Sequence, residues 1–205
     1  MHGKTTLGLR PLILAALLVA GAFAPAAAQP VDSMVTGSLT SQPIGHYEFC
    51  KANPRECSIA MRDRGPARLT KNLLSTLSRV NVSVNRAVKP MNDIDIFGKD
   101  EVWSYPDGVG DCEDYVLEKR RLLQGKGVSL TNLLITVVRK PDGEGHAVLT
   151  VRTDKGDFIL DNLRDDIRPW SKTGYRFLKR QASNHTGRWV NLYAERNRFV
   201  GSVNR

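Results

Sequence analysis

The chain has 205 residues, 41% of them hydrophobic, which is enough for one buried core, so a single domain is expected. Its net charge of +9 forms no dense basic run with interleaved aromatic residues, which argues against a nucleic-acid partner. A solvated basic surface, or one that meets an anionic envelope polymer or an acidic protein, is expected instead. Beyond the N-terminus no segment is long and apolar enough to cross a bilayer, so an integral membrane protein is not expected.

Residues 1–28 have the pattern of a secretory signal peptide. Lys4 and Arg10 precede the apolar stretch PLILAALLVAGAFAP, and small residues precede Gln29, so cleavage after Ala28 is predicted. The alternative is an uncleaved membrane anchor, which the short apolar stretch and its two prolines disfavour. The mature protein is therefore expected to be periplasmic or secreted.

Residues 29–45 are rich in Ser, Thr, Gly and Pro and predict a flexible lead-in. In the following FCKANPREC, Cys50 and Cys57 flank an Asn-Pro pair that favours a turn. Such a loop can bring two thiols together, and exported proteins keep disulfides, so a Cys50–Cys57 bridge is expected. Two free thiols or a metal pair are the alternatives; no second Cys/His couple has the spacing that a metal site requires.

A helix is predicted next, because apolar residues recur at spacings of four and three from Leu69 onward. They are Leu69, Leu73, Leu77, Val80, Val84 and Val88. Residues 89–110 contain KPMND, FGKD and YPDGVG and predict a long ordered loop, a feature that is often functional in a compact domain.

A second helix is predicted to begin at Asp111, which can cap it, with Glu113 and Asp114 in its first turn and a glycine at its end. Cys112 lies among these three acids. Their charges would raise the pKa of its thiol, whereas the N-terminus of a helix stabilises a thiolate. Because a histidine partner would add to the helix effect, a reactive Cys112 is predicted.

The C-terminal part predicts strands. The segments LLITVVR, HAVLTVRT and DFILD are rich in β-branched residues and are separated by the turn sequences PDGEG and DKG. RWVNLY predicts a further strand, and YRFLKR a weaker one. Helices followed by hairpin-linked strands indicate an α+β domain with an antiparallel sheet, spanning residues 46–205.

One histidine is placed for chemistry. His146 opens the strand after the GEG turn, and Asp161 ends the next strand, so adjacent antiparallel strands can bring the two side chains together. With Cys112 they would form a nucleophile, a base and an orienting carboxylate. A structural role for each residue stays open on spacing alone. His46 and His185 are predicted at the surface.

The motifs together resemble those of the bacterial transglutaminase-like cysteine peptidases. GDCEDY at 110–115, GHAVLTV at 145–151 and LDN at 160–162 carry the resemblance, and VWSYP at 102–106 and the cysteine pair agree with it. It spans about residues 45–165. It implies a papain/transglutaminase-like fold, with the nucleophile at the N-terminus of a central helix packed on an antiparallel sheet. It also implies Cys112, His146 and Asp161 as the catalytic triad.

The resemblance further implies a candidate calcium site. In members that cleave adhesins, acidic residues flanking the catalytic cysteine bind calcium, and Asp111 and Glu113 occupy these positions here. No cofactor is expected to be required for the chemistry itself. The alternative is that Asp111 caps the helix, and that Glu113 and Asp114 serve the helix dipole or pair with basic groups such as Lys119 and Arg120.

The leading hypothesis is an exported cysteine peptidase that hydrolyses peptide bonds of an envelope or surface protein through an acyl-enzyme. Transglutaminase-type acyl transfer and a non-catalytic envelope-binding module are the alternatives. A membrane receptor or regulator is a candidate partner by resemblance.

The segment between Trp103 and Cys112 is shorter than in adhesin-cleaving members, which predicts a different substrate. Trp103 is expected either to line the substrate-binding cleft or to pack in the hydrophobic core. The backbone N–H of Cys112 is expected to stabilise an oxyanion.

Overall fold

The structure is a computed structural model that describes residues 1–3 and 32–193. The predicted signal peptide falls almost entirely on residues outside this part. None of the helices in the described ranges is long and apolar enough to span a membrane.

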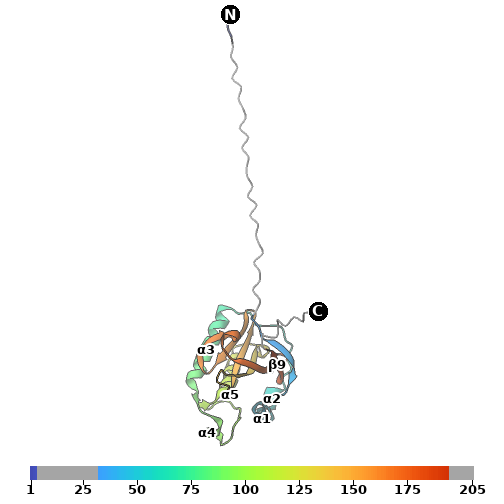
Figure 1. The fold of residues 1–205 in the computed structure, drawn as a ribbon, viewed down its shortest axis with the longest axis vertical. Coiled ribbons are helices and arrows are strands. Elements are labelled where there is room, and N and C mark those ends of the chain that lie inside the picture. The colour runs from blue at the N-terminus through green and yellow to red at the C-terminus, as the bar shows by residue number, and fades with distance from the viewer. Residues whose placement is uncertain (4–31, 194–205) are drawn as a thin grey trace, which may run out of the picture. The chain divides into compact units, whose positions relative to one another are not determined.

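A seven-stranded sheet forms the centre of the domain (Figure 1). Its order is β1-β9-β8-β4-β5-β6-β7, and every neighbouring pair is antiparallel. The strands are β1 (Val35–Thr40), β4 (Leu133–Arg139), β5 (Gly145–Thr153), β6 (Gly156–Asp161), β7 (Arg164–Pro169), β8 (Arg176–Ala182) and β9 (His185–Tyr193). The predicted antiparallel α+β fold is confirmed, and β7 is a strand that the sequence pattern did not indicate.

Five helices and a small second sheet complete the domain in the described residues. The helices are α1 (Ile44–Ala52), α2 (Pro54–Cys57), α3 (Lys71–Ala87), α4 (Asp93–Phe97) and α5 (Cys112–Gly125), and 3-10 turns η1 (Leu130–Asn132) and η2 (Trp170–Lys172) precede β4 and β8. The predicted loop 89–110 contains α4 and two short parallel strands, β2 (Lys89–Pro90) and β3 (Val109–Gly110). The segment is ordered, as predicted, but it holds regular elements instead of a loop throughout, and β2 and β3 pair its two ends.

The central strands are buried on both faces. Leu149 of β5 belongs to the larger core, which α3 and α5 cover, whereas Val148 belongs to a second core on the opposite face with Trp170 and Phe177. Because successive side chains of a strand point to opposite faces, β5 joins both cores. This accounts for the continuous apolar sequence of the strand. The predicted α3 is confirmed, and Thr70 caps it by accepting a hydrogen bond from the Leu73 N–H (3.1 Å).

The prediction of a flexible lead-in is wrong for residues 35–40. They form β1, which pairs with β9 through contacts such as Val35 with Tyr193 and Thr40 with Trp189. β1 is an edge strand and is only half-buried, so its sequence carries little apolar alternation. Its order comes from a strand at the other end of the domain, which a local pattern does not contain.

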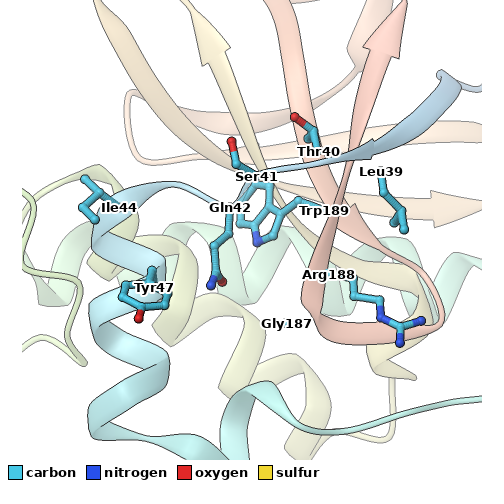
Figure 2. A pocket seen from close by; sticks show the side chains of 9 residues that line it. All are labelled: Leu39, Thr40, Ser41, Gln42, Ile44, Tyr47, Gly187, Arg188 and Trp189. Atoms are coloured by element: carbon cyan, nitrogen blue, oxygen red, sulfur yellow. The ribbon is translucent and has the colours of Figure 1, made fainter.

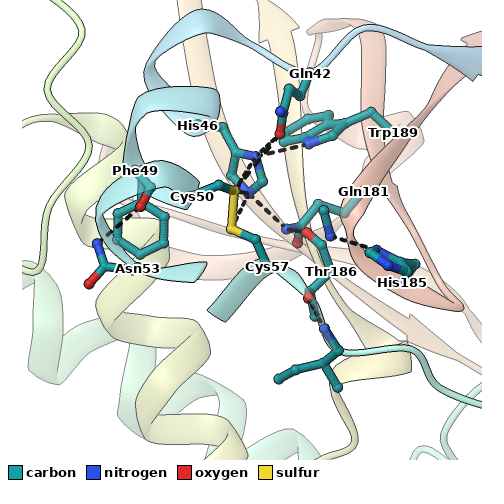
Figure 3. Close-up of a disulfide and its surroundings, with 12 residues drawn as sticks. Gln42, His46, Phe49, Cys50, Asn53, Cys57, Gln181, His185, Thr186 and Trp189 are labelled. Carbon is teal, nitrogen blue, oxygen red and sulfur yellow. Dashed lines mark hydrogen bonds between the residues drawn. A yellow bond between two sulfur atoms is a disulfide. The ribbon is translucent and has the colours of Figure 1, made fainter. Parts of the chain in front are cut away.

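The predicted disulfide between Cys50 and Cys57 is present and joins α1 to α2 (Figure 3). Its Cys50 sulfur lies 3.5 Å from Nδ1 of His46. The placement of His46 at the surface is wrong, because the residue is only 1% exposed. Burial, together with the charge of Arg120, lowers the pKa of His46 to about 4. The imidazole is therefore neutral at neutral pH.

The neutral His46 side chain fits its neighbours. Nδ1 lies 2.8 Å from Oε1 of Gln42 and 3.3 Å from the indole N–H of Trp189, and Nε2 lies 3.2 Å from the Gln181 amide nitrogen, so both ring nitrogens have polar partners. The rings of Trp103 and Trp189 meet the imidazole edge-on. The sequence held a signal for this: His46 lies three and four residues before the apolar Phe49 and Cys50, on one face of α1.

Removing the disulfide is expected to destabilise the domain. The bridge closes a loop with a sequence separation of 7, and the chain-entropy relation gives about 2 kcal/mol for a loop of this size. Urea unfolding of the Cys50→Ala/Cys57→Ala variant should show this loss. In a Cys112→Ala background, adding a reductant should reproduce the loss for the bridged protein and leave the double alanine variant unchanged. Equal stability of the two proteins would contradict the prediction.

Candidate active site

The structure brings the three predicted catalytic residues to one end of the central strands. Cys112 is the first residue of α5, His146 lies at the start of β5, and Asp161 is the last residue of β6. Nε2 of His146 lies 2.9 Å from Oδ1 of Asp161. The backbone N–H of Ala147 donates to Sγ of Cys112 at 3.3 Å, which places the thiol beside the His146 backbone.

Asp161 is buried, and both of its carboxylate oxygens are hydrogen-bonded. Oδ1 accepts from His146 and from the N–H of Leu163 (3.0 Å), while Oδ2 accepts from the phenol of Tyr175 (2.6 Å). Burial raises the pKa of Asp161, but the hydrogen bonds from His146, Tyr175 and Leu163 outweigh burial and hold the pKa below its ordinary value. An ionised Asp161 fixes a proton on Nε2 of His146, which leaves Nδ1 as the free ring nitrogen.

The Cys112 thiol does not have the lowered pKa that was predicted. Its desolvation and the adjacent Glu113 carboxylate raise the pKa well above the ordinary value, and the hydrogen bond from Ala147 offsets only part of this. The S–H group donates to Oε2 of Glu113 at 3.0 Å. Burial and the neighbouring Asp111 in turn raise the pKa of Glu113 to about 9. Desolvation of the thiol, together with the acids around it, therefore outweighs the effect of the helix N-terminus.

A cluster of three carboxylates lies directly beside Cys112. Oxygen atoms of Asp93, Asp111 and Asp114 lie within 4.8 Å of one another. One oxygen of each (Oδ1 of Asp93 and Asp111, Oδ2 of Asp114) is buried without a hydrogen-bond partner in the described part of the chain. The second oxygens of Asp93 and Asp114 are anchored by the N–H groups of Val102 (2.5 Å) and Ser104 (2.8 Å).

This oxygen set fits a hard cation, because carboxylates are the ligands that Ca²⁺ prefers and unpaired buried oxygens are costly otherwise. Burial and the neighbouring acids raise the pKa of Asp114 to about 7. The pair predicted from the sequence, Asp111 and Glu113, does lie close together, with ligand atoms within 4.8 Å of each other. Asp111 belongs to the cluster, while Glu113 joins Asp111 in a second group that contains the thiol. Asp93 was missed; only its place in the acidic NDID stretch could have indicated it.

Asp111 occupies the N-cap position of α5, but its side chain makes no capping hydrogen bond, contrary to the prediction. The alternative that its neighbours pair with Lys119 or Arg120 is not observed either. Nε of Arg120 donates to the Leu133 carbonyl (3.2 Å), and Lys119 is 0% exposed, with its Nζ lacking a hydrogen-bond partner within residues 32–193. Neither basic residue therefore neutralises these acids, and the buried oxygens Oδ1 of Asp111 and Oδ2 of Asp114 keep no hydrogen-bond partner in the described residues.

Replacing the buried Lys119 with methionine is expected to stabilise the protein. Burial lowers the pKa of Lys119 to about 7, which the charges of Asp161 and Asp165 offset in part. Between pH 7 and about 10 the unfolded chain binds more protons at Lys119 than the folded chain does, so the free energy of unfolding falls as pH falls. The destabilisation by Lys119 is therefore largest below pH 7, where the lysine is charged in both the folded and the unfolded chain. That effect is therefore complete below pH 7 and declines as pH rises. Lys119→Met should gain about 1–4 kcal/mol at pH 6, and less at pH 9.

Urea unfolding at both pH values measures this difference. Lys126→Met is the matched control, because Lys126 is exposed at the end of the same helix. A gain for Lys119→Met that does not depend on pH would show that the lysine is not held in the low-dielectric site described.

The thiol and the imidazole open onto a cleft of about 830 Å³. Its lining is formed by Pro43, Pro90, Met91, Asn92, Asp95, Glu101, Trp103, Asp111, Cys112, Glu113, Val137, Lys140, Gly145, His146, Ala147, Asn162 and Leu163. Trp103 both lines the cleft and is buried, and it packs closely on Gly45, where a Cβ atom would lie 2.3 Å from the indole ring. A side chain at position 45 would therefore displace this wall of the cleft.

A second cavity of about 510 Å³ has a different set of lining residues (Figure 2). It is lined by Leu39, Thr40, Ser41, Gln42, Ile44, Tyr47, Gly187, Arg188 and Trp189. None of the predicted catalytic side chains is in its lining, whereas Cys112 and His146 line the cleft of about 830 Å³.

A protein-family model matches most of this chain. The family model described as bacterial transglutaminase-like cysteine proteinase BTLCP matches residues 36–197. The chain belongs to this family. The match contains Cys112, His146 and Asp161 as well as the three clustered aspartates, so the whole candidate site lies in the part that is typical of these cysteine proteinases.

Solved structures of Legionella pneumophila LapG are similar to this member of the family. The calcium-bound form is 25% identical, with a TM-score of 0.50, and the alignment covers 65% of this chain and 75% of LapG. An EGTA-treated form is 26% identical, with a TM-score of 0.49, over 60% of this chain and 69% of LapG. The family match and the similarity to the calcium-bound form show a transglutaminase-like fold. No curated protein matches the chain.

Proposed function

We propose that this protein is an exported cysteine peptidase that hydrolyses peptide bonds of a protein in the cell envelope or at the cell surface. Cys112 is the nucleophile, His146 the general base and acid, and Asp161 the orienting residue. The observation that carries the proposal is the 2.9 Å contact between His146 and Asp161, with the Cys112 sulfur held beside the His146 backbone at the cleft. Membership of a cysteine-proteinase family supports the reaction class.

The geometry supports a two-stage reaction. The Cys112 thiol gives its proton to His146, and the thiolate attacks the substrate carbonyl carbon, which forms a tetrahedral oxyanion. The backbone N–H of Cys112, at the first position of α5, stabilises this oxyanion. His146 then protonates the departing amine, and an acyl-enzyme is left on Sγ. A water molecule, deprotonated by His146, hydrolyses the thioester, while Asp161 stabilises the imidazolium at each stage.

Calcium belongs to this proposal as a structural and electrostatic partner. Asp93, Asp111 and Asp114 would hold the ion through their unpaired oxygens, with Glu113 as a further candidate ligand beside Asp111. When bound, its positive charge would offset the carboxylates that raise the pKa of the Cys112 thiol. That LapG has been solved in calcium-bound and EGTA-treated forms supports the choice of this metal.

The export proposal rests on the sequence of residues 1–28, which has the charged, apolar and small-residue regions of a signal peptide. The disulfide supports it, because such bridges persist in oxidising compartments such as the periplasm.

The test is to incubate the purified protein with a library of internally quenched peptides, in calcium and in EGTA, beside Cys112→Ser as the control. Cleavage by the wild type alone, with an acyl group trapped on Cys112 and detected by mass spectrometry, is the expected result. A primary amine added to the mixture separates two chemistries: coupling of the amine to the acyl group would indicate acyl transfer instead of hydrolysis. Cleavage that persists in Cys112→Ser, or no acylation of Cys112 in either condition, would overturn the proposal.

A further inference from the structure

Tyr175 contacts two of the three proposed catalytic side chains, although it lies outside the motifs that indicate the triad. It lies between η2 and β8. Its hydroxyl donates to Oδ2 of Asp161 at 2.6 Å. Its ring meets the His146 ring edge-on, with centroids 5.7 Å apart and planes inclined at 72°. The phenol thus lies against the far oxygen of Asp161 and one edge of the imidazole.

The backbone that carries Tyr175 is fixed by local hydrogen bonds. Gly174 has a φ of +78°, which turns the chain into β8. The Tyr175 N–H donates to the Thr173 hydroxyl (3.3 Å), and that hydroxyl donates to the Trp170 carbonyl (2.8 Å). Tyr175 also packs against the second core, which contains Trp170 and Phe177. The phenol therefore reaches Asp161 from an ordered turn.

The two oxygens of Asp161 have unequal support. Oδ1 is shared by His146 and the Leu163 N–H, whereas the hydrogen bond to Oδ2 comes from Tyr175. Without the phenol, a buried carboxylate oxygen would lose its partner, and rotation of the carboxylate would no longer be restrained on that side. The other charged groups near this pair are Lys119 of α5 and Arg164 and Arg168 of β7, none of which makes a hydrogen bond to Asp161 through its side chain in the described structure.

We propose that Tyr175 is a positioning residue of this site: its hydroxyl fixes the Asp161 carboxylate, and through it the His146 imidazole, in the orientation that proton transfer to and from Cys112 requires. This inference rests on the proposed function for its catalytic meaning, while the hydrogen bond itself can be tested without any substrate. Because the phenol donates to the charged form of Asp161, it also extends the pH range over which the carboxylate is ionised.

The first test uses Tyr175→Phe, which keeps the ring and removes only the hydroxyl. p-Nitrophenyl acetate serves as the probe, because attack by Cys112 forms an acetyl thioester and releases p-nitrophenolate without requiring the natural substrate. The expected result is a kcat about tenfold lower with KM within about twofold of the wild type, and an acid limb of the pH profile that moves to higher pH. An unchanged kcat and an unmoved acid limb would overturn the inference.

The second test is independent of activity. The proton on Nε2 of His146, bonded to Asp161, is expected as a downfield NMR resonance in the wild type. In Tyr175→Phe it should shift and should broaden at a higher pH as pH is lowered, because Asp161 is protonated more readily. An identical resonance and pH dependence in both proteins would contradict the inference.

Tyr115→Phe is the matched control. The Tyr115 hydroxyl donates a hydrogen bond of the same length, 2.6 Å, to the Val88 carbonyl and does not contact Asp161. It should lower the stability without moving the acid limb or the His146 resonance. If neither the ester nor a peptide acylates Cys112 of the wild type, the proposed function fails, and the NMR comparison still decides whether Tyr175 fixes the Asp161–His146 pair.

Discussion

Asp161→Asn is expected to lower kcat by about 10²–10⁴-fold while the protein stays folded. Asparagine has nearly the shape of aspartate, so the contacts with His146, Leu163 and Tyr175 can be kept, but the negative charge is lost. An imidazolium formed beside a neutral amide has no counter-charge in this buried site, so the step in which His146 takes the thiol proton becomes costly. If the amide turns its NH₂ group toward His146, the imidazole is held in the wrong tautomer as well.

Two measurements check this effect. The rate of iodoacetamide labelling at Cys112, mapped by peptide mass spectrometry, should fall in Asp161→Asn as the cleavage rate falls, because both need the thiolate. Asp166→Asn is the control: this carboxylate is exposed on β7 and pairs with Arg168, so its loss should change neither rate. A fully active Asp161→Asn protein would remove Asp161 from the mechanism.

Calcium is expected to stabilise the protein strongly, and Asp93→Asn to abolish this effect. At a hundredfold excess over its Kd, an ion that binds only the folded state adds about 2.7 kcal/mol, or about 5–10 °C in Tm for a domain of this size. Asp93 is buried, and one of its oxygens is unpaired and lies with those of Asp111 and Asp114. An amide in its place removes one charged ligand from the set.

In EGTA, the same substitution should change the Tm in the opposite direction. Without a cation, the buried carboxylates repel one another, so the neutral amide that Asp93→Asn introduces is expected to raise the Tm of the EGTA-treated protein. Asp95→Asn is the matched control, because Asp95 lies on the same helix but is exposed and outside the cluster. Differential scanning fluorimetry in calcium, magnesium and EGTA separates the cases. An equal calcium shift in the wild type and Asp93→Asn would contradict a site at this cluster.

The parts of the site that depend on local pattern were predictable from the sequence. His146 and Asp161 lie on adjacent strands of one hairpin, so their contact follows from antiparallel pairing. The disulfide follows from a short turn between two cysteines. Cys112 at a helix start is likewise visible in the sequence, but the raised pKa of its thiol is not, because it depends on how deeply Cys112 and Glu113 are buried.

The features that were missed depend on contacts between distant segments. Strand β1 needs β9, and the burial of His46 needs Trp103 and Trp189, which come from a loop and from the last strand. Asp93 joins Asp111 and Asp114 only because β2 and β3 pair the two ends of the loop that carries α4. Local periodicity contains no information about contacts between distant segments. A sequence pattern alone therefore predicts an exposed residue or a loop at each of these positions.

The origin of the site in three separate elements has a consequence for the cell that makes this protein. Cys112 starts a helix, whereas His146 and Asp161 lie on two neighbouring strands, so Cys112 joins them only when α5 packs on the sheet. A newly synthesised or translocating chain carries an ordinary, isolated thiol with no imidazole beside it. Under the proposed chemistry, proteolytic activity therefore requires the folded domain, because the thiol has no base beside it until α5 and the two strands are packed together.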